Sequence, residues 1–245
     1  MRERARSDEV STVSTDPADP PEDATLDDSV LAGMGSGLKG VFISFEGLDG
    51  CGKSTQMELL AAALREHGYV VLVSREPGGT EVGEAIRDVL LDPRHHGMSP
   101  RAEALLYAAA RAHLVDEVIR PALADGQIVL CDRYLDSSLA YQGYGRDLGH
   151  DDIITLNVWA TGCLFPDLTL FLDLDDSIRT GRLDAVPDRL EAEDDQFHRR
   201  VAAGFRELLA LHPHRIRRVD AGGSEAEVQE RVRAVVEEEL ELFSH

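Results

Sequence analysis

Apolar residues are distributed along this chain in two alternating patterns. Short segments dominated by apolar residues have the length of buried strands, whereas longer segments with an apolar residue every three or four positions have the periodicity of amphipathic helices. The predicted strands cover residues 41–45, 69–73, 127–131, 168–172 and 215–219, and the predicted helices cover residues 56–67, 81–91, 101–124, 135–141, 151–161 and 225–242, with a further helix ending at residue 211. Because nearly all-apolar strands alternate with helices, we expect an α/β fold in which a five-stranded parallel sheet carries helices on both faces.

The first 38 residues do not follow this pattern. They are rich in Asp, Glu, Ser, Thr and Pro and contain few apolar residues. Such a composition cannot bury enough apolar surface to offset the entropy of ordering, so we expect an acidic, disordered extension over residues 1–38. A docking or regulatory tail is the alternative interpretation. Residues 39–245 are long enough to form one substantial domain.

A phosphate-binding loop follows the first predicted strand. Residues 47–54, Gly-Leu-Asp-Gly-Cys-Gly-Lys-Ser, match the pattern G-x-x-x-x-G-K-[ST] between a strand and a helix, the setting that this motif requires. The glycines let backbone N–H groups converge on a triphosphate, and the helix N-terminus adds its positive dipole end. The motif predicts a P-loop NTPase fold, with ATP bound by Gly47, Leu48, Asp49, Gly50, Cys51, Gly52, Lys53, Ser54 and Thr55.

Charged residues also stand at the carboxyl ends of other predicted strands. Arg75 follows the second strand, and Asp132 and Arg133 follow the third. Ligands of open parallel sheets bind at the carboxyl ends of the strands. The sequence therefore predicts one site, in which these residues and the phosphate loop converge.

The overall charge limits the classes of partner. The chain of 245 residues has 46 acidic and 25 basic side chains and a net charge of −21, which argues against a nucleic-acid-binding protein because such proteins carry a basic face. Three widely spaced cysteines suggest a reducing cytoplasm and no disulfide framework. No apolar run reaches the roughly 18 residues that a membrane span requires, and we expect no membrane partner.

Four segments of the chain carry a resemblance to a known family. They are residues 45–55 with the phosphate loop, 75–80 (Arg-Glu-Pro-Gly-Gly-Thr), 132–143 (Asp-Arg-Tyr followed by Ser-Ser-Leu-Ala-Tyr-Gln-Gly) and 166–173 (Pro-Asp-Leu-Thr-Leu-Phe-Leu-Asp). In order and spacing they resemble the thymidylate kinase family, whose members phosphorylate dTMP to dTDP with ATP. The resemblance extends from about residue 40 to residue 242.

The resemblance implies a pocket for the thymine base and its sugar. Tyr107 occupies the position that stacks on the base, where the family usually has Phe, and Arg111 occupies the position that hydrogen-bonds a base carbonyl. Their i, i+4 spacing places both on one face of a helix. Ser138 matches a position at the polar edge of the base, and Tyr141 matches one that crowds the ribose 2′-hydroxyl. Gln142, which follows Tyr141, is expected to bind substrate as well.

The resemblance also implies how phosphates are held. Arg133 is expected to bind the phosphate of the acceptor, with Arg75 and Arg87 as further contacts and Asp49 facing the acceptor sugar or a magnesium shell. Arg75 and Glu76 could instead pair with each other. Mg²⁺, brought by ATP, is expected at Ser54 and Asp132.

A polar, arginine-bearing segment at residues 178–191 is similar to the mobile lid of the family. Cations that close over the migrating phosphoryl group would stabilise its charge in the transition state. Together with Lys53 and Arg133, the expected catalytic residues are therefore the lid arginines Arg179, Arg182 and Arg189.

The sequence thus favours a cytoplasmic enzyme that transfers the γ-phosphoryl group of ATP to dTMP in dTTP synthesis. A monophosphate oxygen is already anionic near neutral pH, so no general base is required. The alternatives are a kinase for another pyrimidine nucleotide or nucleoside, and a regulator that binds nucleotides without catalysis. Because the family usually forms homodimers, we expect a homodimer.

Overall fold

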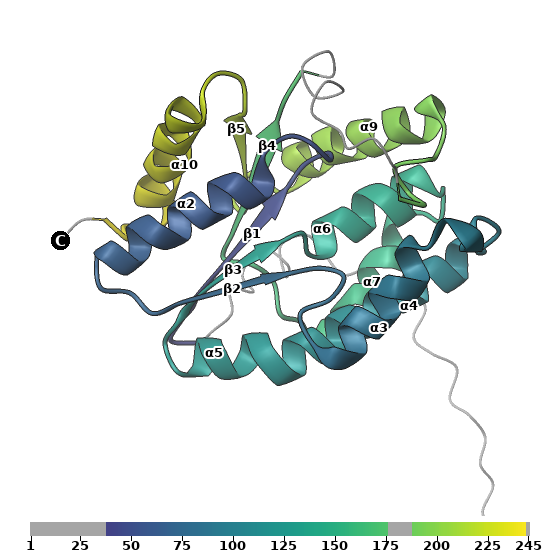
Figure 1. Cartoon of the computed structure of the whole chain (residues 1–245), viewed down its shortest axis with the longest axis horizontal. Coiled ribbons are helices and arrows are strands. Elements are labelled where there is room, and N and C mark those ends of the chain that lie inside the picture. The colour runs from purple at the N-terminus through teal and green to yellow at the C-terminus, as the bar shows by residue number, and fades with distance from the viewer. Residues whose placement is uncertain (1–37, 176–187, 244–245) are drawn as a thin grey trace, which may run out of the picture.

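The computed structural model of the chain describes residues 38–175 and 188–243 (Figure 1). The expected extension at residues 1–38 lies outside the described residues except for Leu38, and so does most of the expected lid, up to residue 187. The division into an extension and a domain stays a prediction.

Five strands form one sheet, in which every neighbouring pair is parallel and the order is β2-β3-β1-β4-β5. This confirms the predicted five-stranded parallel sheet. The strands are β1 (Val41–Glu46), β2 (Val71–Arg75), β3 (Ile128–Asp132), β4 (Leu168–Asp173) and β5 (Ile216–Asp220).

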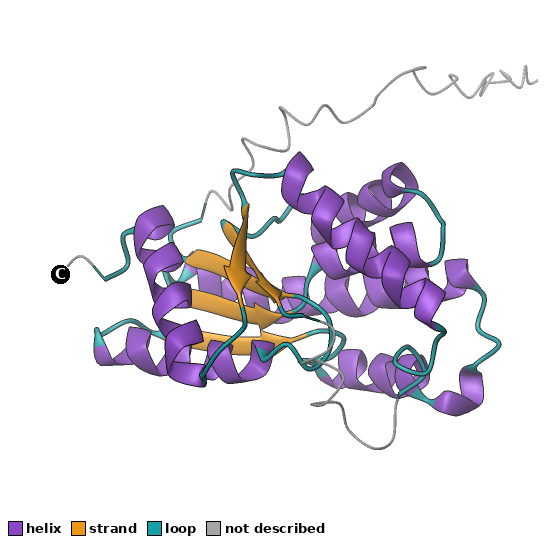
Figure 2. Ribbon diagram, turned by 90° about the horizontal axis from the view of Figure 1, so that it is seen from above, coloured by secondary structure: helices purple, strands orange, loops and turns teal. Residues whose placement is uncertain are grey.

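Helices cover both faces of the sheet, as Figure 2 shows. They are α2 (Lys53–Glu66), α3 (Glu81–Leu91), α4 (Pro100–Leu114), α5 (Arg120–Ala124), α6 (Leu135–Ser138), α7 (His150–Thr161), α9 (Asp195–Leu211) and α10 (Glu225–Leu240), with the short helical segments η1 (Pro93–His95), η2 (Val115–Ile119) and η3 (Leu139–Gly145). Side-chain caps fix several of their starts: the hydroxyl of Thr80 accepts a hydrogen bond from the Gly83 N–H, and Ser224 forms a capping box with Glu227.

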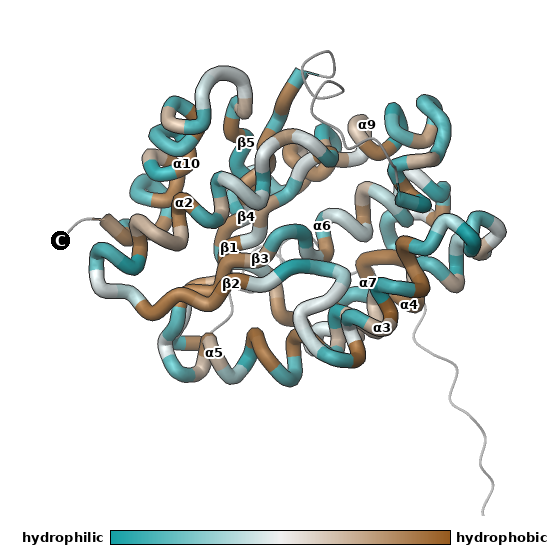
Figure 3. Tube along the Cα trace, viewed as in Figure 1, coloured by the Kyte–Doolittle hydropathy of each residue, from teal (hydrophilic) through white to brown (hydrophobic). Residues whose placement is uncertain are grey.

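Alternate residues of each strand enter two separate cores. Phe42 belongs to the core beneath the helices from α3 to α9, whereas its neighbour Ile43 belongs to the core beneath α2 and α10. Side chains alternate across a strand, and in a sheet that is covered on both faces each alternate set is apolar. The apolar colouring of the central strands in Figure 3 reflects this double burial.

The predicted helix at residues 101–124 is not one regular α-helix. It consists of α4, the π-helical segment η2 and α5, with Pro121 in the first turn of α5. Pro121 has no N–H to donate to the carbonyl group four residues earlier, so the regular hydrogen-bond ladder cannot continue through this point. The predicted helix at residues 135–141 likewise becomes α6 followed by the π-helical segment η3.

Among the described residues, no helix combines the length and the apolar character needed to cross a bilayer.

The packing of α2 predicts different effects for two adjacent leucines. Leu60 is fully buried in the core beneath α10, whereas Leu59 is 39% exposed. We expect Leu60→Ala to lower the free energy of unfolding by about 2–5 kcal/mol, because it removes buried contacts and leaves a cavity. Leu59→Ala, the matched control, should change it by less than about 1 kcal/mol. Urea unfolding followed by far-UV circular dichroism measures both values, and equal losses would contradict the packing described here.

Candidate functional site

A cavity of about 950 Å³ lies at the carboxyl ends of the strands, between the loop after β1 and the helices α3, α4 and α6. Its walls contain residues 49–55 of the phosphate loop together with Arg75, Asp132 and Arg133. The structure thus brings together, around one cavity, the segments that were expected to converge at this edge of the sheet.

The phosphate loop owes its shape to glycines. Gly52 has a φ angle of 97°, a left-handed conformation that favours glycine, and it leads directly into α2. A Cβ atom at Gly47 would lie 2.6 Å from the carbonyl oxygen of Leu172, too close for any other residue. Gly47 and Leu48 contribute their carbonyl oxygens, which accept hydrogen bonds from Lys53 Nζ at 3.2 and 3.3 Å. Lys53 is thereby held inside the loop, facing the cavity.

Ser54 and Asp132 meet at the mouth of this loop. The hydroxyl group of Ser54 donates a hydrogen bond of 2.7 Å to Asp132 Oδ2, and both residues line the cavity. Although they are 78 positions apart in the sequence, the parallel pairing of β1 and β3 brings their loops to the same edge of the sheet. A hydroxyl and a carboxylate oxygen are hard ligands suited to Mg²⁺, which usually takes one or two carboxylates and completes its shell with phosphates and water.

Arg133 lies beside the phosphate loop, in contact with Asp49. It has a φ angle of 69°, unusual for a residue with a side chain. Its Nη2 lies 2.5 Å from Asp49 Oδ1, its Nη1 donates to Ser137 Oγ at 3.0 Å, and its guanidinium lies 5.2 Å from the centre of the Tyr141 ring. Burial opposes the charge of this group, but the carboxylate of Asp49 keeps the pKa of Arg133 well above its usual value.

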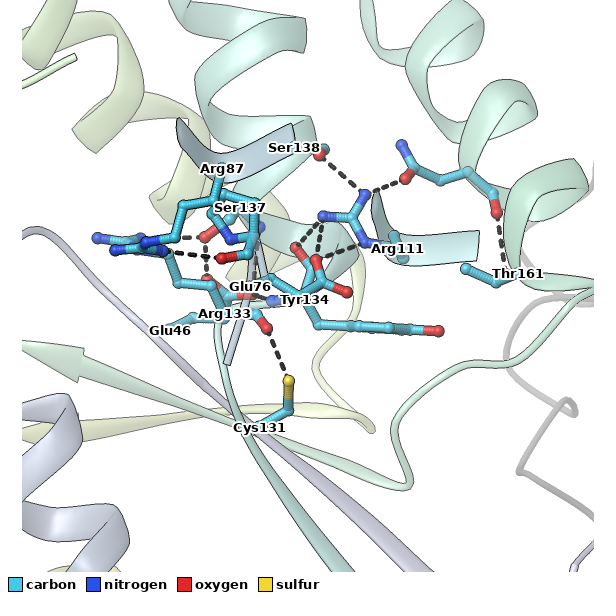
Figure 4. Close-up of polar contacts among 12 residues, drawn as sticks. Glu46, Glu76, Arg87, Arg111, Cys131, Arg133, Tyr134, Ser137, Ser138 and Thr161 are labelled. Atoms are coloured by element: carbon cyan, nitrogen blue, oxygen red, sulfur yellow. Dashed lines mark hydrogen bonds and ion pairs between the residues drawn. The ribbon is translucent and has the colours of Figure 1, made fainter. Parts of the chain in front are cut away.

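Arg111 is buried in the wall of the same cavity, where each of its guanidinium nitrogens has a protein partner (Figure 4). Nε and Nη2 lie 2.8 and 2.6 Å from Glu76 Oε2. Nη1 donates hydrogen bonds to Ser138 Oγ at 2.9 Å and to Asn157. Nη2 also donates to the Tyr134 carbonyl oxygen at 3.1 Å. The structure therefore fixes Arg111 and Ser138 as one hydrogen-bonded unit. Its contact with a base stays a prediction.

The pairing considered for Arg75 and Glu76 is wrong, because adjacent residues of an extended segment point to opposite faces. Glu76 turns inward to Arg111, and Arg75 pairs with Glu84 of α3 at 3.0 Å. Arg87 lies beside them and donates a hydrogen bond of 2.8 Å to the carbonyl oxygen of Pro77. Arg75 and Arg87 both line the cavity.

The remaining substrate-binding candidates come from α4 and η3. Tyr107 and Tyr141 are buried residues whose side chains line the cavity, and burial raises the pKa of both hydroxyl groups. Tyr141 also donates a hydrogen bond of 3.4 Å to Asp49 Oδ2. Gln142 reaches the cavity wall while its amide donates a hydrogen bond of 2.9 Å to Glu103.

The structure describes only one of the three arginines that were expected to act from the lid. Arg179 and Arg182 lie outside the described residues. Arg189 is buried, pairs with Glu103 at 2.6 Å and donates a hydrogen bond of 2.6 Å to the Leu90 carbonyl oxygen. Its neighbours at positions 188 and 190 line the cavity, but Arg189 itself faces away from it toward Glu103. A contact between these arginines and the transferred phosphate stays a prediction.

Glu103 is one residue that the sequence analysis did not identify. It is fully buried in α4, one turn before Tyr107, and accepts hydrogen bonds from Gln142, Arg146 and Arg189. Burial alone would raise the pKa of Glu103, but the hydrogen bonds from Arg146 and Gln142 keep it below its usual value. Its charge would mark it as an exposed residue although it shares a helix face with Tyr107, so only the tertiary contacts identify it.

The sequence analysis also missed the far end of the cavity. The walls there are formed by Gln56, Ala221, Gly223, Glu225 and Val228, from the first turn of α2, the loop after β5 and the start of α10. The sequence did contain a signal for them. An Ala-Gly-Gly-Ser turn at the carboxyl end of a fifth parallel strand lies at the edge of the sheet where ligands bind.

Comparisons with known proteins agree with this geometry. The family model for thymidylate kinase matches residues 45–232. The chain is 52% identical over 197 residues to a thymidylate kinase of an Exiguobacterium species, across 80% of this chain and 93% of that protein. It is also 52% identical over 200 residues to a thymidylate kinase of Clavibacter sepedonicus, across 80% and 94% of the two chains.

A solved structure extends the agreement to three dimensions. The crystal structure of thymidylate kinase from Ehrlichia chaffeensis superposes with a TM-score of 0.68 at 33% sequence identity, and the match covers 80% of this chain and 98% of that one. The residues that the family model matches, 45–232, include the phosphate loop and the residues that line the cavity. This chain belongs to the thymidylate kinase family.

Proposed function

We propose that this chain transfers the γ-phosphoryl group of ATP to dTMP, giving ADP and dTDP. The observation that carries the proposal is the single cavity that joins the phosphate loop to the wall containing Tyr107, Arg111 and Arg133, in a chain of the thymidylate kinase family. One cavity with cations on both sides can hold two anionic nucleotides with their phosphates facing each other.

The chemistry then depends mainly on placement and charge. The loop amides, the N-terminus of α2 and Lys53 hold the phosphates of ATP. Arg133 holds the phosphate of dTMP, whose anionic oxygen attacks in line, and Arg75 and Arg87 add positive charge on the same side. In phosphoryl transfer these positioning and electrostatic effects account for most of the rate.

Mg²⁺ is part of the proposal, and its support is the 2.7 Å contact between Ser54 and Asp132 in the cavity wall. Within the described parts of the chain, no group of three or more His, Cys, Asp or Glu side chains forms a metal cage. Ser54 and Asp132 would hold the ion beside the phosphates of ATP. When bound, Mg²⁺ supplies neutralisation of the negative charge on the transferred group.

Selection of dTMP is assigned to the wall formed by α4, α6 and η3. The Tyr107 ring offers a flat apolar surface for a pyrimidine, and Ser138, which Arg111 holds in place, offers its hydroxyl group for the polar edge of the base. Tyr141, fixed by Asp49, occupies space near the sugar and favours deoxyribose. A catalytically inactive regulator is not favoured, because Lys53 and Arg133 are both in place around the cavity.

A panel of acceptors tests the proposed activity directly. With ATP as donor, dTMP should have the highest kcat/KM. For dUMP, kcat/KM should be lower than for dTMP by roughly tenfold or more, because a single methyl group in an apolar pocket contributes at least about that much. Thymidine should not react, since it has no phosphate to attack with. A coupled assay for ADP measures all of these rates, and a higher kcat/KM for dCMP or thymidine than for dTMP would contradict the proposal.

Removal of either cavity cation should abolish most turnover. We expect Lys53→Ala and Arg133→Ala each to lower kcat/KM by about 10²–10³-fold, the loss typical of one preorganised charge-stabilising group. Arg94→Ala is the control, because the Arg94 side chain is 86% exposed and pairs with Asp92 outside the cavity. Its kcat/KM should stay within about twofold of the original value. Normal activity in both cavity variants, with unchanged circular dichroism spectra, would refute these assignments.

The proposed assembly is a homodimer formed through α3, α4 and α7, which pack side by side (Figure 1). Large apolar side chains are exposed on all three helices: Val82 and Val89 on α3, Leu105 on α4 and Trp159 on α7, the last 82% exposed. Exposed apolar residues that gather on adjacent helices are typical of a surface that packs against a partner. A second copy of the chain would bury them.

A charge placed on this surface tests the dimer. Trp159→Glu should convert the dimer to a monomer, because a buried carboxylate without a partner is costly at an interface. Val70→Glu is the control, since Val70 is 66% exposed and lies between α2 and β2, away from the three helices. Light scattering after size exclusion reports the mass of each variant. A monomeric parent chain, or dimers for both variants, would rule out this surface.

We also place the enzyme in the cytoplasm, supported by three cysteines that are all free thiols in the structure.

A further inference from the structure

Glu46 is a buried carboxylate that the proposed mechanism does not use. It is the last residue of β1, directly before the phosphate loop, and its side chain is inaccessible to solvent. It accepts hydrogen bonds from the Tyr134 N–H at 2.8 Å, from the Ser137 N–H at 3.2 Å and from Ser137 Oγ at 2.5 Å. All three donors belong to the turn that follows Arg133.

This turn determines where the backbone of Arg133 lies. The Arg133 N–H donates to the carbonyl oxygen of Phe45 at 2.9 Å, and the next N–H, that of Tyr134, donates to Glu46. Phe45 and Glu46, two successive residues of β1, thus accept hydrogen bonds from the N–H groups of the successive residues Arg133 and Tyr134. Arg133 adopts a left-handed conformation, which is strained in a residue with a side chain and requires such support.

Ser137 connects Glu46 to the guanidinium of Arg133. Its hydroxyl group donates to Glu46 Oε2 and accepts from Arg133 Nη1 at 3.0 Å, as the dashed lines in Figure 4 show. On its other side, the guanidinium contacts Asp49 at 2.5 Å. The proposed ligand of the acceptor phosphate is therefore held from two directions, and Glu46 anchors one of them.

We propose that Glu46 is a positioning residue for the acceptor phosphate, acting on the backbone of Arg133 through the Tyr134 N–H and on its guanidinium through Ser137. The inference rests on the proposed function. Glu46 itself does not line the cavity, so it acts through other residues rather than on the substrate.

The charge state of Glu46 matters for this role. Burial and the nearby Asp136 raise the pKa of Glu46 to about 7, although Arg133 and the hydrogen bonds from Ser137 and Tyr134 oppose the shift. The other ionisable groups whose charges interact with it are Arg111, Cys131, Tyr141 and Arg215. When Glu46 is ionised, it draws the Ser137 proton toward itself and turns a lone pair of the hydroxyl to Arg133. A neutral carboxyl group orients this hydroxyl less strongly.

Glu46→Gln tests the role because glutamine resembles the neutral carboxyl group. We expect the ratio of KM for dTMP, variant over parent, to be near one at pH 6 and to rise to roughly tenfold at pH 8.5, the effect of one charge-assisted hydrogen bond. The ionisation of dTMP itself cancels in this ratio. KM for ATP should change by less than about twofold, because the network contacts the acceptor side.

Ser137 and Ser44 provide the second variant and the control. Ser137→Ala should raise KM for dTMP because it breaks the link, whereas Ser137→Thr, which keeps the hydroxyl group, should restore it. Ser44→Ala removes a different buried hydroxyl group, which lies in β1 and forms a hydrogen bond of 2.8 Å with Thr169. This variant should leave KM for dTMP unchanged. These serine variants test the link even where Glu46→Gln does not fold.

The outcomes separate this inference from the proposed function. If the parent chain does not phosphorylate dTMP, the proposed function fails. If the parent is active but the KM ratio of Glu46→Gln is constant with pH, or KM for ATP rises equally, Glu46 has no specific positioning role. Equal effects of Ser137→Ala and Ser44→Ala would also overturn the inference.

Discussion

A guanidinium taken out of water has to be matched by a carboxylate, and the walls of this cavity are built around that requirement. Arg111 in the cavity wall meets Glu76 at 2.6 Å, and Arg189, which does not line the cavity, meets Glu103 at the same distance. This pairing explains how a chain with a net charge of −21 assembles a site for anionic nucleotides. The cations are placed by nearby carboxylates, with Arg111 beside Glu76 and both Lys53 and Arg133 beside Asp49, so the overall negative charge does not prevent a cationic site. A side chain fixed in this way loses little entropy when a phosphate arrives.

Glu46 shows that the burial of a carboxylate beside this site costs stability when the carboxylate is ionised. Its pKa is raised from about 4.5 to about 7, so the folded chain binds more protons at this carboxyl group than the unfolded chain does. Its contribution to the free energy of unfolding is therefore present below pH 4.5 and is lost as the pH rises through about 7. The ionised form is the one that orients Ser137 and, through it, Arg133. At this residue the protonation state that favours folding is thus the opposite of the one that favours a well-placed phosphate ligand.

The sequence allowed the elements and the location of the site to be predicted, because both follow from local patterns. Apolar periodicity identified the strands, and the spacing of glycines with Lys53 identified the phosphate loop. The partners of the charged residues could not be predicted. Arg111 is bound by a carboxylate 35 positions away in the sequence and by an amide 46 positions away, and only the packing of α4 against α7 and the loop after β2 brings them together. The π-helical segments η2 and η3 were missed for a related reason, since their apolar spacing differs little from that of an α-helix.

Asp49 marks the point where the two halves of the cavity meet. An acid within a phosphate loop would repel a triphosphate if it were unpaired, but its Oδ1 lies 3.7 Å from Lys53 Nζ and 2.5 Å from Arg133 Nη2. In the proposed function Lys53 holds the donor phosphates and Arg133 holds the acceptor phosphate. Two cations that close together would repel each other, and a carboxylate between them removes most of that repulsion. Asp49 therefore lets the chain hold both cations near the position of the transferred group before any nucleotide binds.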